Sequence, residues 1–354
     1  MDDVQAVFVG EKINKVRWKP EALSSSSYFV TGSWDEQICH LALWSYASDE
    51  DESYSIPAKL RTVPNCGDIT EIKFVNSSTC VVATSGGSVR CFRVDVRYPQ
   101  SADLREVTSW EKLHFLPYGT RCSCTSLSCF EEDIATVGED GKLNLLTLRQ
   151  QKPVHVVDEA DSSTLRCVCF LKHSEILTGN LRGILKIWDL KSSTVRPTMS
   201  FIMPHEQVSA SCVVHHPTQR HLVLAGGEEG ALVVWDLRHS IYPITVLNAH
   251  SSSIKDLEFH PDRPEHLFSC SADGGIWHWK TEGSRVSQLT KMTDMTAEES
   301  PWVSGAVAKQ RIQIYALMPQ LHKPINSLDV SKANVIFGCD NEAVYICKNT
   351  SVYQ

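Results

Sequence analysis

The stretch from Leu222 to Asp236 reads LVLAGGEEGALVVWD: an apolar strand, a tight turn rich in glycine and acidic residues, and a second strand that ends in Trp-Asp. Two other stretches repeat it clearly, Ile176 to Asp189 (ILTGNLRGILKIWD) and Leu267 to Trp279 (LFSCSADGGIWHW). Weaker copies lie at Phe29 to Trp44, Val81 to Phe92, Ile134 to Leu146 and Val335 to Cys347. A pattern that returns seven times along one chain indicates a radial or stacked array of repeats.

The last residue of each repeated strand marks the period of the array. These markers are Trp44, Phe92, Leu146, Trp188, Trp235, Trp279 and Cys347. They lie 48, 54, 42, 47, 44 and 68 residues apart, and all but the last distance are near the period of about 40 to 45 residues of WD40 repeats or exceed it by a modest loop. Apolar and polar residues alternate within the strands, which predicts half-buried antiparallel sheets. The chain thus resembles the WD40 family and is predicted to be an all-β, seven-bladed WD40 β-propeller.

The two ends of the chain predict how the ring closes. Only seven residues follow Cys347, too few for another strand and its turn, whereas Val4 to Val9 reads as a lone strand ahead of Ile13 to Trp18. We expect Val4 to Val9 to complete the last blade, because closure protects strand edges that would otherwise template aggregation. Residues 1–354 are predicted to form a single domain, since seven blades of about 45 residues need about 315 residues.

Two segments are predicted to interrupt the array. Residues from about 282 to 310 are polar and rich in Ser, Thr and charge, and loops of this length are usually disordered or functional. Within them, Pro301-Trp302-Val303 is a candidate anchor for a partner. A shorter insert is expected at about 97–118, where Trp110 and Phe115 would either cover a strand edge or face a partner.

Composition excludes several kinds of partner and site. The formal net charge is -8 and no run of Lys and Arg occurs, so no direct contact with nucleic acid is expected, because phosphate binding needs clustered cations. The chain begins without a basic and apolar leader and has no apolar run near 18 residues, so neither secretion nor membrane insertion is expected. The 13 cysteines include no Cys-x-x-Cys pair, which favours buried free thiols over disulfides or a metal site.

No stretch of the sequence predicts catalysis. Gly226 to Gly230 lacks the Gly-Lys-Ser/Thr of a phosphate loop and is read as a hairpin turn. Two histidine-proline sites, His215-His216-Pro217 and His260-Pro261, occur where the first strand of a repeat ends. We interpret them as strand ends, because proline stops a strand, and not as ligand sites. Without nucleophile-elbow, zinc-protease or calcium-loop motifs, we predict no catalytic, cofactor-binding or metal-binding residues and no enzymatic activity.

One polar constellation follows from the WD40 resemblance. In that family a His before the first strand, a Ser or Thr on the second, an Asp in the next turn and the Trp of the third form a hydrogen-bonded tetrad. The matching residues are His250, Ser269, Asp273 and Trp279. Other blades depart from the pattern: Ala225 and Glu229 replace Ser and Asp in the fifth blade, and Leu146 replaces Trp in the third. Those blades are expected to depend more on apolar packing.

Longer phrases carry a narrower resemblance. They are Lys12 to Pro20 (KINKVRWKP), Thr31 to Asp35 (TGSWD) with Leu41 to Trp44 (LALW), Thr136 to Gly141 (TVGEDG), Ala160 to Leu165 (ADSSTL) and Pro264 to Phe268 (PEHLF). These phrases resemble the nucleoporin 43 family, the small WD-repeat subunits of the Y-shaped scaffold complex in the outer rings of the nuclear pore. The likeness runs through all seven blades.

The resemblance implies a non-catalytic scaffold that supports pore assembly and the transport of protein and mRNA between nucleus and cytoplasm. It implies a hetero-oligomer, docked on the short arm of the Y beside a helical nucleoporin and a neighbouring propeller. It also implies a location at the nuclear envelope, and at kinetochores in mitosis through the same complex. The family has no short interaction motif, so no binding residue is carried over.

A second reading keeps a different class of function open. Trp235-Asp236-Leu237-Arg238 matches the Trp-Asp-x-Arg signature of propellers that act as substrate receptors of cullin-RING ubiquitin ligases. In such a receptor Trp235, Asp236 and Arg238 would form the adaptor-binding site, with Arg238 exposed. The structural alternative is that Arg238 caps the turn after its strand, where the preceding blade has Lys191. These receptors often carry a helical segment before the propeller, which is not seen in this sequence.

Overall fold

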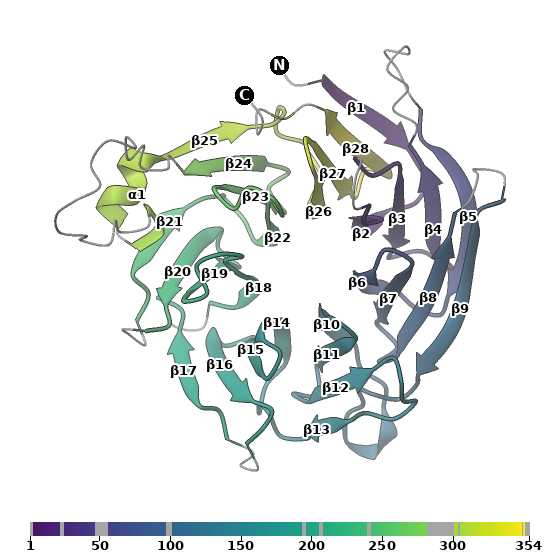
Figure 1. Cartoon of the computed structure of the whole chain (residues 1–354), viewed down its shortest axis with the longest axis horizontal. Helices are drawn as coiled ribbons and strands as arrows, with labels where there is room; N and C mark the ends of the chain where they lie inside the picture. The colour runs from purple at the N-terminus through teal and green to yellow at the C-terminus, as the bar shows by residue number, and fades with distance from the viewer. Residues whose placement is uncertain are drawn as a thin grey trace, which may run out of the picture.

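Seven four-stranded antiparallel sheets surround a central axis (Figure 1). The structure is a computed structural model that describes residues 3–21, 25–46, 56–96, 101–192, 196–204, 208–238, 242–281, 301–303, 305–348 and 350. The predicted all-β, seven-bladed WD40 propeller is confirmed. Over the described residues, no helix is long and apolar enough to cross a membrane.

Each blade begins with an inner strand at the channel and ends with an outer strand at the rim. Blade 1 contains β2 (Ile13–Trp18), β3 (Tyr28–Ser33), β4 (Cys39–Ser45) and β5 (Ala58–Asn65). Blade 2 contains β6 (Ile69–Asn76), β7 (Thr79–Thr84), β8 (Val89–Asp95) and β9 (Asp103–Trp110). Blade 3 contains β10 (Cys124–Phe130), β11 (Asp133–Gly138), β12 (Leu143–Thr147) and β13 (His155–Val157).

The other four blades repeat this order. Blade 4 contains β14 (Leu165–Lys172), β15 (Glu175–Asn180), β16 (Ile184–Asp189) and β17 (Met199–Ile202). Blade 5 contains β18 (Ala210–His215), β19 (Leu222–Gly227), β20 (Ala231–Asp236) and β21 (Thr245–Asn248). Blade 6 contains β22 (Ile254–Phe259), β23 (His266–Ser271), β24 (Ile276–Thr281) and β25 (Ile312–Ala316). Blade 7 contains β26 (Ile325–Ser331), β27 (Asn334–Cys339), β28 (Ala343–Lys348) and β1 (Asp3–Phe8).

The N-terminal strand closes the ring, as the sequence predicts. β1 pairs antiparallel with β28, with Val4 opposite Cys347 and Phe8 opposite Ala343. The Val9 N–H also donates a hydrogen bond to the Glu342 carbonyl at 2.8 Å. In Figure 1 β1 lies along the outer edge of β28 and completes blade 7.

The apolar core is divided among the junctions between blades. Seven clusters of buried side chains occur in the described part of the chain, and each draws on two neighbouring blades. At the closing junction, Ile336 and Ile346 of blade 7 pack with Val16 and Trp44 of blade 1. Both faces of every sheet are therefore covered, which a single blade could not achieve alone.

The turn between β19 and β20 explains the glycine-rich phrase that defines the repeat. Gly230 has a φ of +88°, in the left-handed region, and a β-carbon there would collide with the backbone carbonyl of His250. Glycine tolerates this conformation and this close approach without a steric penalty. The predicted hairpin at Gly226 to Gly230 is confirmed, because β19 and β20 pair directly on either side of it.

The segment 97–118 differs from the expected insert. Residues 97–100 lie outside the described residues, but Asp103–Trp110 forms β9, the outer strand of blade 2. Trp110 is buried, and its Nε1 donates a hydrogen bond to the Gln150 carbonyl at 3.0 Å. The middle of the segment therefore belongs to a blade, because Asp103–Trp110 pairs with β8. Of the two aromatics, only Phe115 reaches the surface, where 39% of it is exposed.

The end of the 282–310 segment also corrects an expectation. Residues 282–300 lie outside the described residues, while Pro301–Val303 forms a 3-10 turn, followed by α1 (Gly305–Arg311) beside β21 at the rim (Figure 1). Trp302 is 1% exposed and packs edge-on against Phe259. Its carbonyl accepts a hydrogen bond from Thr245 Oγ1 at 2.8 Å. The hypothesis that Pro301-Trp302-Val303 anchors a partner is wrong for the Trp302 indole. This side chain is buried in the apolar cluster between blades 5 and 6 and holds its own segment there.

All 13 cysteines are free thiols, as the odd count and the strand positions predict. Most are buried in the junctions between blades, and Cys66 is exposed. Burial raises the pKa of the Cys91 thiol to about 11 and that of the Cys129 thiol to about 12. These side chains thus stay protonated and pack as small apolar groups.

Candidate functional site: the polar tetrad and the charged channel

The four predicted tetrad residues meet in blade 6. Trp279 Nε1 donates a hydrogen bond to Ser269 Oγ at 2.9 Å, and Ser269 Oγ lies 2.8 Å from His250 Nε2. The other nitrogen of the imidazole, His250 Nδ1, lies 3.2 Å from Asp273 Oδ2. Burial lowers the pKa of His250, only partly offset by Asp273, so the imidazole is neutral at physiological pH. Every member has a partner, which makes a buried polar network a source of rigidity.

The same network continues into the backbone. Asp273 accepts hydrogen bonds from the N–H groups of Ser251 and Gly275, at 2.9 and 2.7 Å. These contacts lower the pKa of Asp273 against the opposing effect of burial. The tetrad therefore ties the loop before β22 to the turn between β23 and β24.

We expect Ser269→Ala to lower the free energy of unfolding by about 1 to 3 kcal/mol, the cost of leaving a buried donor unsatisfied. The substitution removes the acceptor of Trp279 Nε1 and the partner of His250 Nε2. Urea titration measures the change. Ser269→Thr is the matched control, because Thr31, Thr136 and Thr178 occupy the equivalent place in blades 1, 3 and 4. A loss of equal size in both variants would show that the hydroxyl is not what matters.

Blade 3 holds a second network that the sequence reading missed. His114 Nδ1 lies 2.8 Å from Asp140 Oδ1, and His114 Nε2 lies 3.1 Å from Thr136 Oγ1. Asn144 Nδ2, at 3.3 Å from His114 Nε2, supplies the polar contact in this blade, where Leu146 replaces Trp. The expectation that blade 3 depends more on apolar packing is thus only partly right. Asp140 in the phrase TVGEDG was the available signal.

Blade 5 shows the opposite outcome. Ala225 stands where blade 6 has Ser269, and among the described residues Trp235 Nε1 has no hydrogen-bond partner. Trp235 is 1% exposed and packs against Phe201 of blade 4. This blade fits the expectation of greater dependence on apolar packing.

The Trp-Asp-x-Arg residues form a compact turn cap. Asp236 is buried and accepts hydrogen bonds from Arg238 Nε at 2.9 Å and from Arg238 Nη2 at 2.6 Å. It also accepts one from the Arg238 N–H at 2.9 Å. The Arg238 side chain is 54% exposed but is oriented by Asp236, while the Trp235 side chain is buried. Of the three residues assigned to an adaptor site, only Arg238 thus has a largely exposed side chain.

The two histidine-proline sites are matching turn caps. His216 Nδ1 accepts hydrogen bonds from the N–H groups of Thr218 and Gln219, at 3.3 and 3.1 Å. His260 Nδ1 accepts in the same way from Asp262 and Arg263, both at 3.1 Å. Because burial lowers the pKa of both imidazoles, they remain neutral acceptors.

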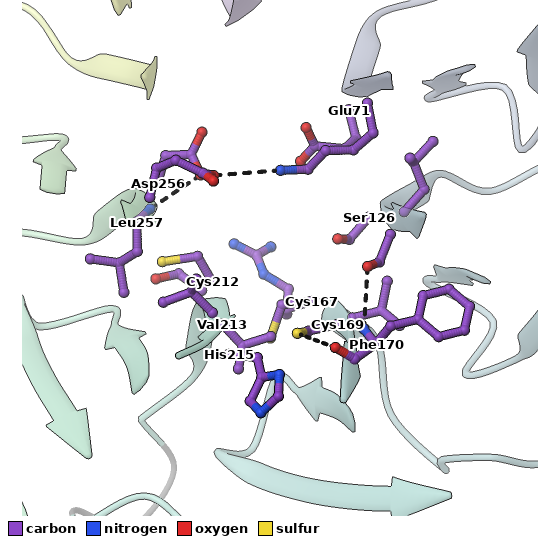
Figure 2. Close-up of a pocket in the computed structure, with 18 of the residues that line it drawn as sticks. Glu71, Ser126, Cys167, Cys169, Phe170, Cys212, Val213, His215, Asp256 and Leu257 are labelled. Atoms are coloured by element: carbon purple, nitrogen blue, oxygen red, sulfur yellow. Dashed lines mark hydrogen bonds and ion pairs between the residues drawn. The ribbon is translucent and has the colours of Figure 1, made fainter. Parts of the chain in front are cut away.

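The central channel contains a charged cluster that the sequence reading did not identify. Its members sit two residues apart on inner strands: Lys15 and Arg17 on β2, Glu71 and Lys73 on β6, Asp256 and Glu258 on β22. Residues two apart in a strand share a face, so pairs of charges in otherwise apolar strands were the signal. Figure 2 shows Glu71 and Asp256 along one side of the channel and Cys167, Cys212 and His215 along the other.

Arg17 is the hub of this cluster and is 4% exposed. Its Nη2 lies 2.8 Å from Glu71 Oε1, and its Nη1 lies 3.0 Å from Asp256 Oδ2 across the channel. The guanidinium also donates to the carbonyls of Ile72 at 3.1 Å and Leu328 at 2.9 Å. One side chain of blade 1 thereby contacts blades 2, 6 and 7, including the junction where the ring closes.

The cluster shifts the pKa values of its carboxyl groups in opposite directions. Burial would raise the pKa of Asp256, but Arg17 and Lys15 overcome it and lower the value to about 2. Burial raises the pKa of Glu258 to about 7, because Lys73, 3.9 Å away, compensates only in part. The channel thus holds an ionised centre around Arg17 and a carboxyl group that titrates near neutrality.

Comparisons with known proteins identify the family. Residues 241–280 match the WD40 family described as WD domain, G-beta repeat. The chain is 34% identical to Nucleoporin Nup43 of Homo sapiens over 99% of both chains, and 34% identical to Nucleoporin Nup43 of Mus musculus over 98% of this chain and 99% of that protein. It is 22% identical to Nuclear pore complex protein NUP43 of Arabidopsis thaliana over 91% of this chain and 90% of the plant protein. The similarity spans all seven blades, and the chain belongs to the Nup43 family of nucleoporins.

Proposed function

We propose that this protein is a non-catalytic scaffold subunit of the nuclear pore complex. The observation that carries the proposal is 34% identity to Nucleoporin Nup43 of Homo sapiens over 99% of both chains. The similar region contains the seven blades, including the closing strand β1, and the turn at Pro301–Val303 that precedes α1. We accordingly expect the protein at nuclear pores in the nuclear envelope.

The architecture suits a scaffold. Closure by β1, the core at each blade junction and the Arg17 cluster all tie neighbouring blades together. A ring held in this way offers two faces and a rim to its partners while its backbone changes little on binding. Because a propeller fold alone hosts many functions, the assignment depends on the family and not on the fold.

The finer role that we propose is docking on the short arm of the Y-shaped complex, beside a helical nucleoporin and a neighbouring propeller. In this position the protein supports pore assembly and transport, and through the same complex it acts at kinetochores in mitosis. The partner is a protein surface, so the contacts come from exposed side chains of the faces and rim, among them Tyr118, whose side chain is fully exposed on the loop before β10.

Location and co-purification test this proposal together. A fluorescently tagged full-length chain is expected to give a continuous nuclear rim in interphase, and affinity purification is expected to recover a stoichiometric set of nucleoporins. A diffuse cytoplasmic signal without nucleoporins would contradict the proposal. Recovery of a cullin adaptor would support the ubiquitin-ligase reading instead, and Arg238→Ala should then abolish that recovery. In a pore scaffold, Arg238→Ala leaves the nuclear rim unchanged.

A further inference from the structure

A belt of hydrogen bonds runs around one end of the channel. In five blades, the second residue of the inner strand donates a side-chain hydrogen bond to the first carbonyl of the next inner strand. The pairs are Asn14 to Ile69 at 2.7 Å, Thr70 to Cys124 at 2.5 Å, Thr125 to Leu165 at 2.5 Å, Ser211 to Ile254 at 2.5 Å and Asn326 to Ile13 at 3.1 Å. Short polar side chains thus link blade to blade, and we call this ring the polar belt.

Two blades break the polar belt with long cations. The second residue of the inner strand is Arg166 in blade 4 and Lys255 in blade 6, on either side of Ser211 in blade 5. Within the described residues, neither cation forms a hydrogen bond or an ion pair, and both are partly buried. Lys15 nearby has Glu71 as its partner at 3.1 Å. Among the described residues, the channel therefore carries two cations without an ion-pair partner.

Arg166 and Lys255 both line one cavity among the inner strands, which has a volume of about 370 Å³. Other residues that line this cavity are labelled in Figure 2. Burial lowers the pKa of Lys255, and repulsion by Arg166 and Lys15 lowers it further, against a smaller opposing effect of Asp340. Lys15, Arg166 and Lys255 all line this one cavity, so like charges face the same space. The carboxylates of the cavity do not relieve this repulsion: Glu71 and Asp256 are held by Arg17, and Glu258 lies beside Lys73.

We propose that the cavity binds a phosphate-class oxyanion between Arg166 and Lys255. Two cations without an ion-pair partner match a group that carries about -1.5 to -2 at neutral pH, as a phosphate does. A guanidinium binds such a group in a bidentate manner, while an ammonium contributes a point charge. A single carboxylate would leave one of the two cations unpaired. The ligand is either free inorganic phosphate or the phosphate of a small organic molecule, and the site links blades 4, 5 and 6 where the polar belt is interrupted.

Thermal melting and calorimetry of the full-length chain test the site. The probes are inorganic phosphate, pyrophosphate and inositol hexakisphosphate, each compared with sodium chloride at equal ionic strength and pH 7.5. We expect saturable binding of at least one probe and a rise in melting temperature of a few degrees. A preference for inorganic phosphate indicates the free ion, whereas a preference for the inositol compound indicates an organic phosphate. Equal effects of all probes and chloride would overturn the proposal.

The repeat itself supplies the decisive variant. Arg166→Thr with Lys255→Thr places in blades 4 and 6 the residue that completes the polar belt in blades 2 and 3. The double variant is expected to melt no lower than the parent without phosphate, because repulsion is removed, and to lose the rise with phosphate. Arg105→Thr with Arg149→Thr changes the net charge equally at exposed positions and should keep the rise. Retention of binding by the belt-completing variant would refute the site.

Discussion

Replacing Arg17 with Met is expected to lower the free energy of unfolding by about 3 to 5 kcal/mol, the usual cost of removing one partner from a buried ion pair. The methionine fills much of the same volume but leaves the carboxylates of Glu71 and Asp256 without their cation at the centre of the ring. Lys15 remains beside Glu71 at 3.1 Å, so Asp256 bears most of the loss. Chemical denaturation of the full-length chain measures the change.

The effect of Arg17→Met is expected to shrink in acid. In the parent, the pKa of Asp256 is lowered to about 2 from a usual value of 3.8, so its ionised form stabilises the fold above about pH 4, and this contribution is lost as pH falls toward 2. In the variant, burial without Arg17 raises the pKa of Asp256, and the carboxyl takes up a proton at a higher pH. A protonated carboxyl is cheaper to bury than a charge, so the gap between variant and parent should be smaller at pH 5 than at pH 7.5.

Two comparisons isolate the charge of Arg17. Adding Glu71→Gln and Asp256→Asn to Arg17→Met removes the stranded carboxylates and should restore a large part of the lost stability. Arg105→Met, at an exposed position of β9, should change it by less than about 0.5 kcal/mol. If Arg17→Met melts with the parent, the channel cluster is not a source of stability.

The repeat made the fold predictable from the sequence. The phrase LVLAGGEEGALVVWD contains strand alternation, a turn that requires glycine at Gly230 and an aromatic end at Trp235. Each of these has a local cause, so each can be read without knowing the rest of the chain. The closure of the ring could be predicted by counting strands at both ends of the sequence. Blade 7 lacks a fourth strand after β28, and β1 supplies it.

Contacts between distant parts of the chain were not predictable in the same way. Trp302 follows a long polar segment, and nothing near it in sequence indicates that its indole packs on Phe259. The β9 strand was hidden because Asp103 to Trp110 is rich in polar and charged residues, as suits an outer strand exposed on one side. For Asp103 to Trp110, pairing with β8 decides the structure more than composition does.

The functional residues follow the same division. The tetrad of blade 6 was identified because a known pattern assigns its four positions, whereas the His114 network was missed when Leu146 replaced the expected Trp. The Arg17 cluster contains residues of blades 1, 2 and 6. Two of its members, Arg17 and Asp256, are 239 positions apart in the sequence. The one local signal was that each of these inner strands has two charged residues at positions i and i+2. A search for the Trp-Asp repeat does not consider these positions.

Deleting residues 1–9 is expected to cost about 5 kcal/mol and to lower the melting temperature by roughly 10 °C. The deletion removes β1, which pairs with β28 over six residue positions, and each hydrogen bond lost contributes about 1 kcal/mol. It also removes Val4 and Val9, which pack against the cores on either side of blade 7. Calorimetry of the chain that starts at Gly10 measures the effect.

A peptide added in trans distinguishes loss of the strand from general damage. The truncated chain exposes the edge of β28, and an extended peptide can add to such an edge by main-chain hydrogen bonds. A synthetic peptide of residues 1–10 should therefore raise the melting temperature of the truncated chain in proportion to its concentration and leave the intact chain unchanged. A scrambled peptide of the same composition should do neither, since Val4 and Val9 must reach their own cores in register. An unchanged melting temperature after truncation would mean that the Arg17 contacts and the apolar junction between blades 7 and 1 hold the ring closed without β1.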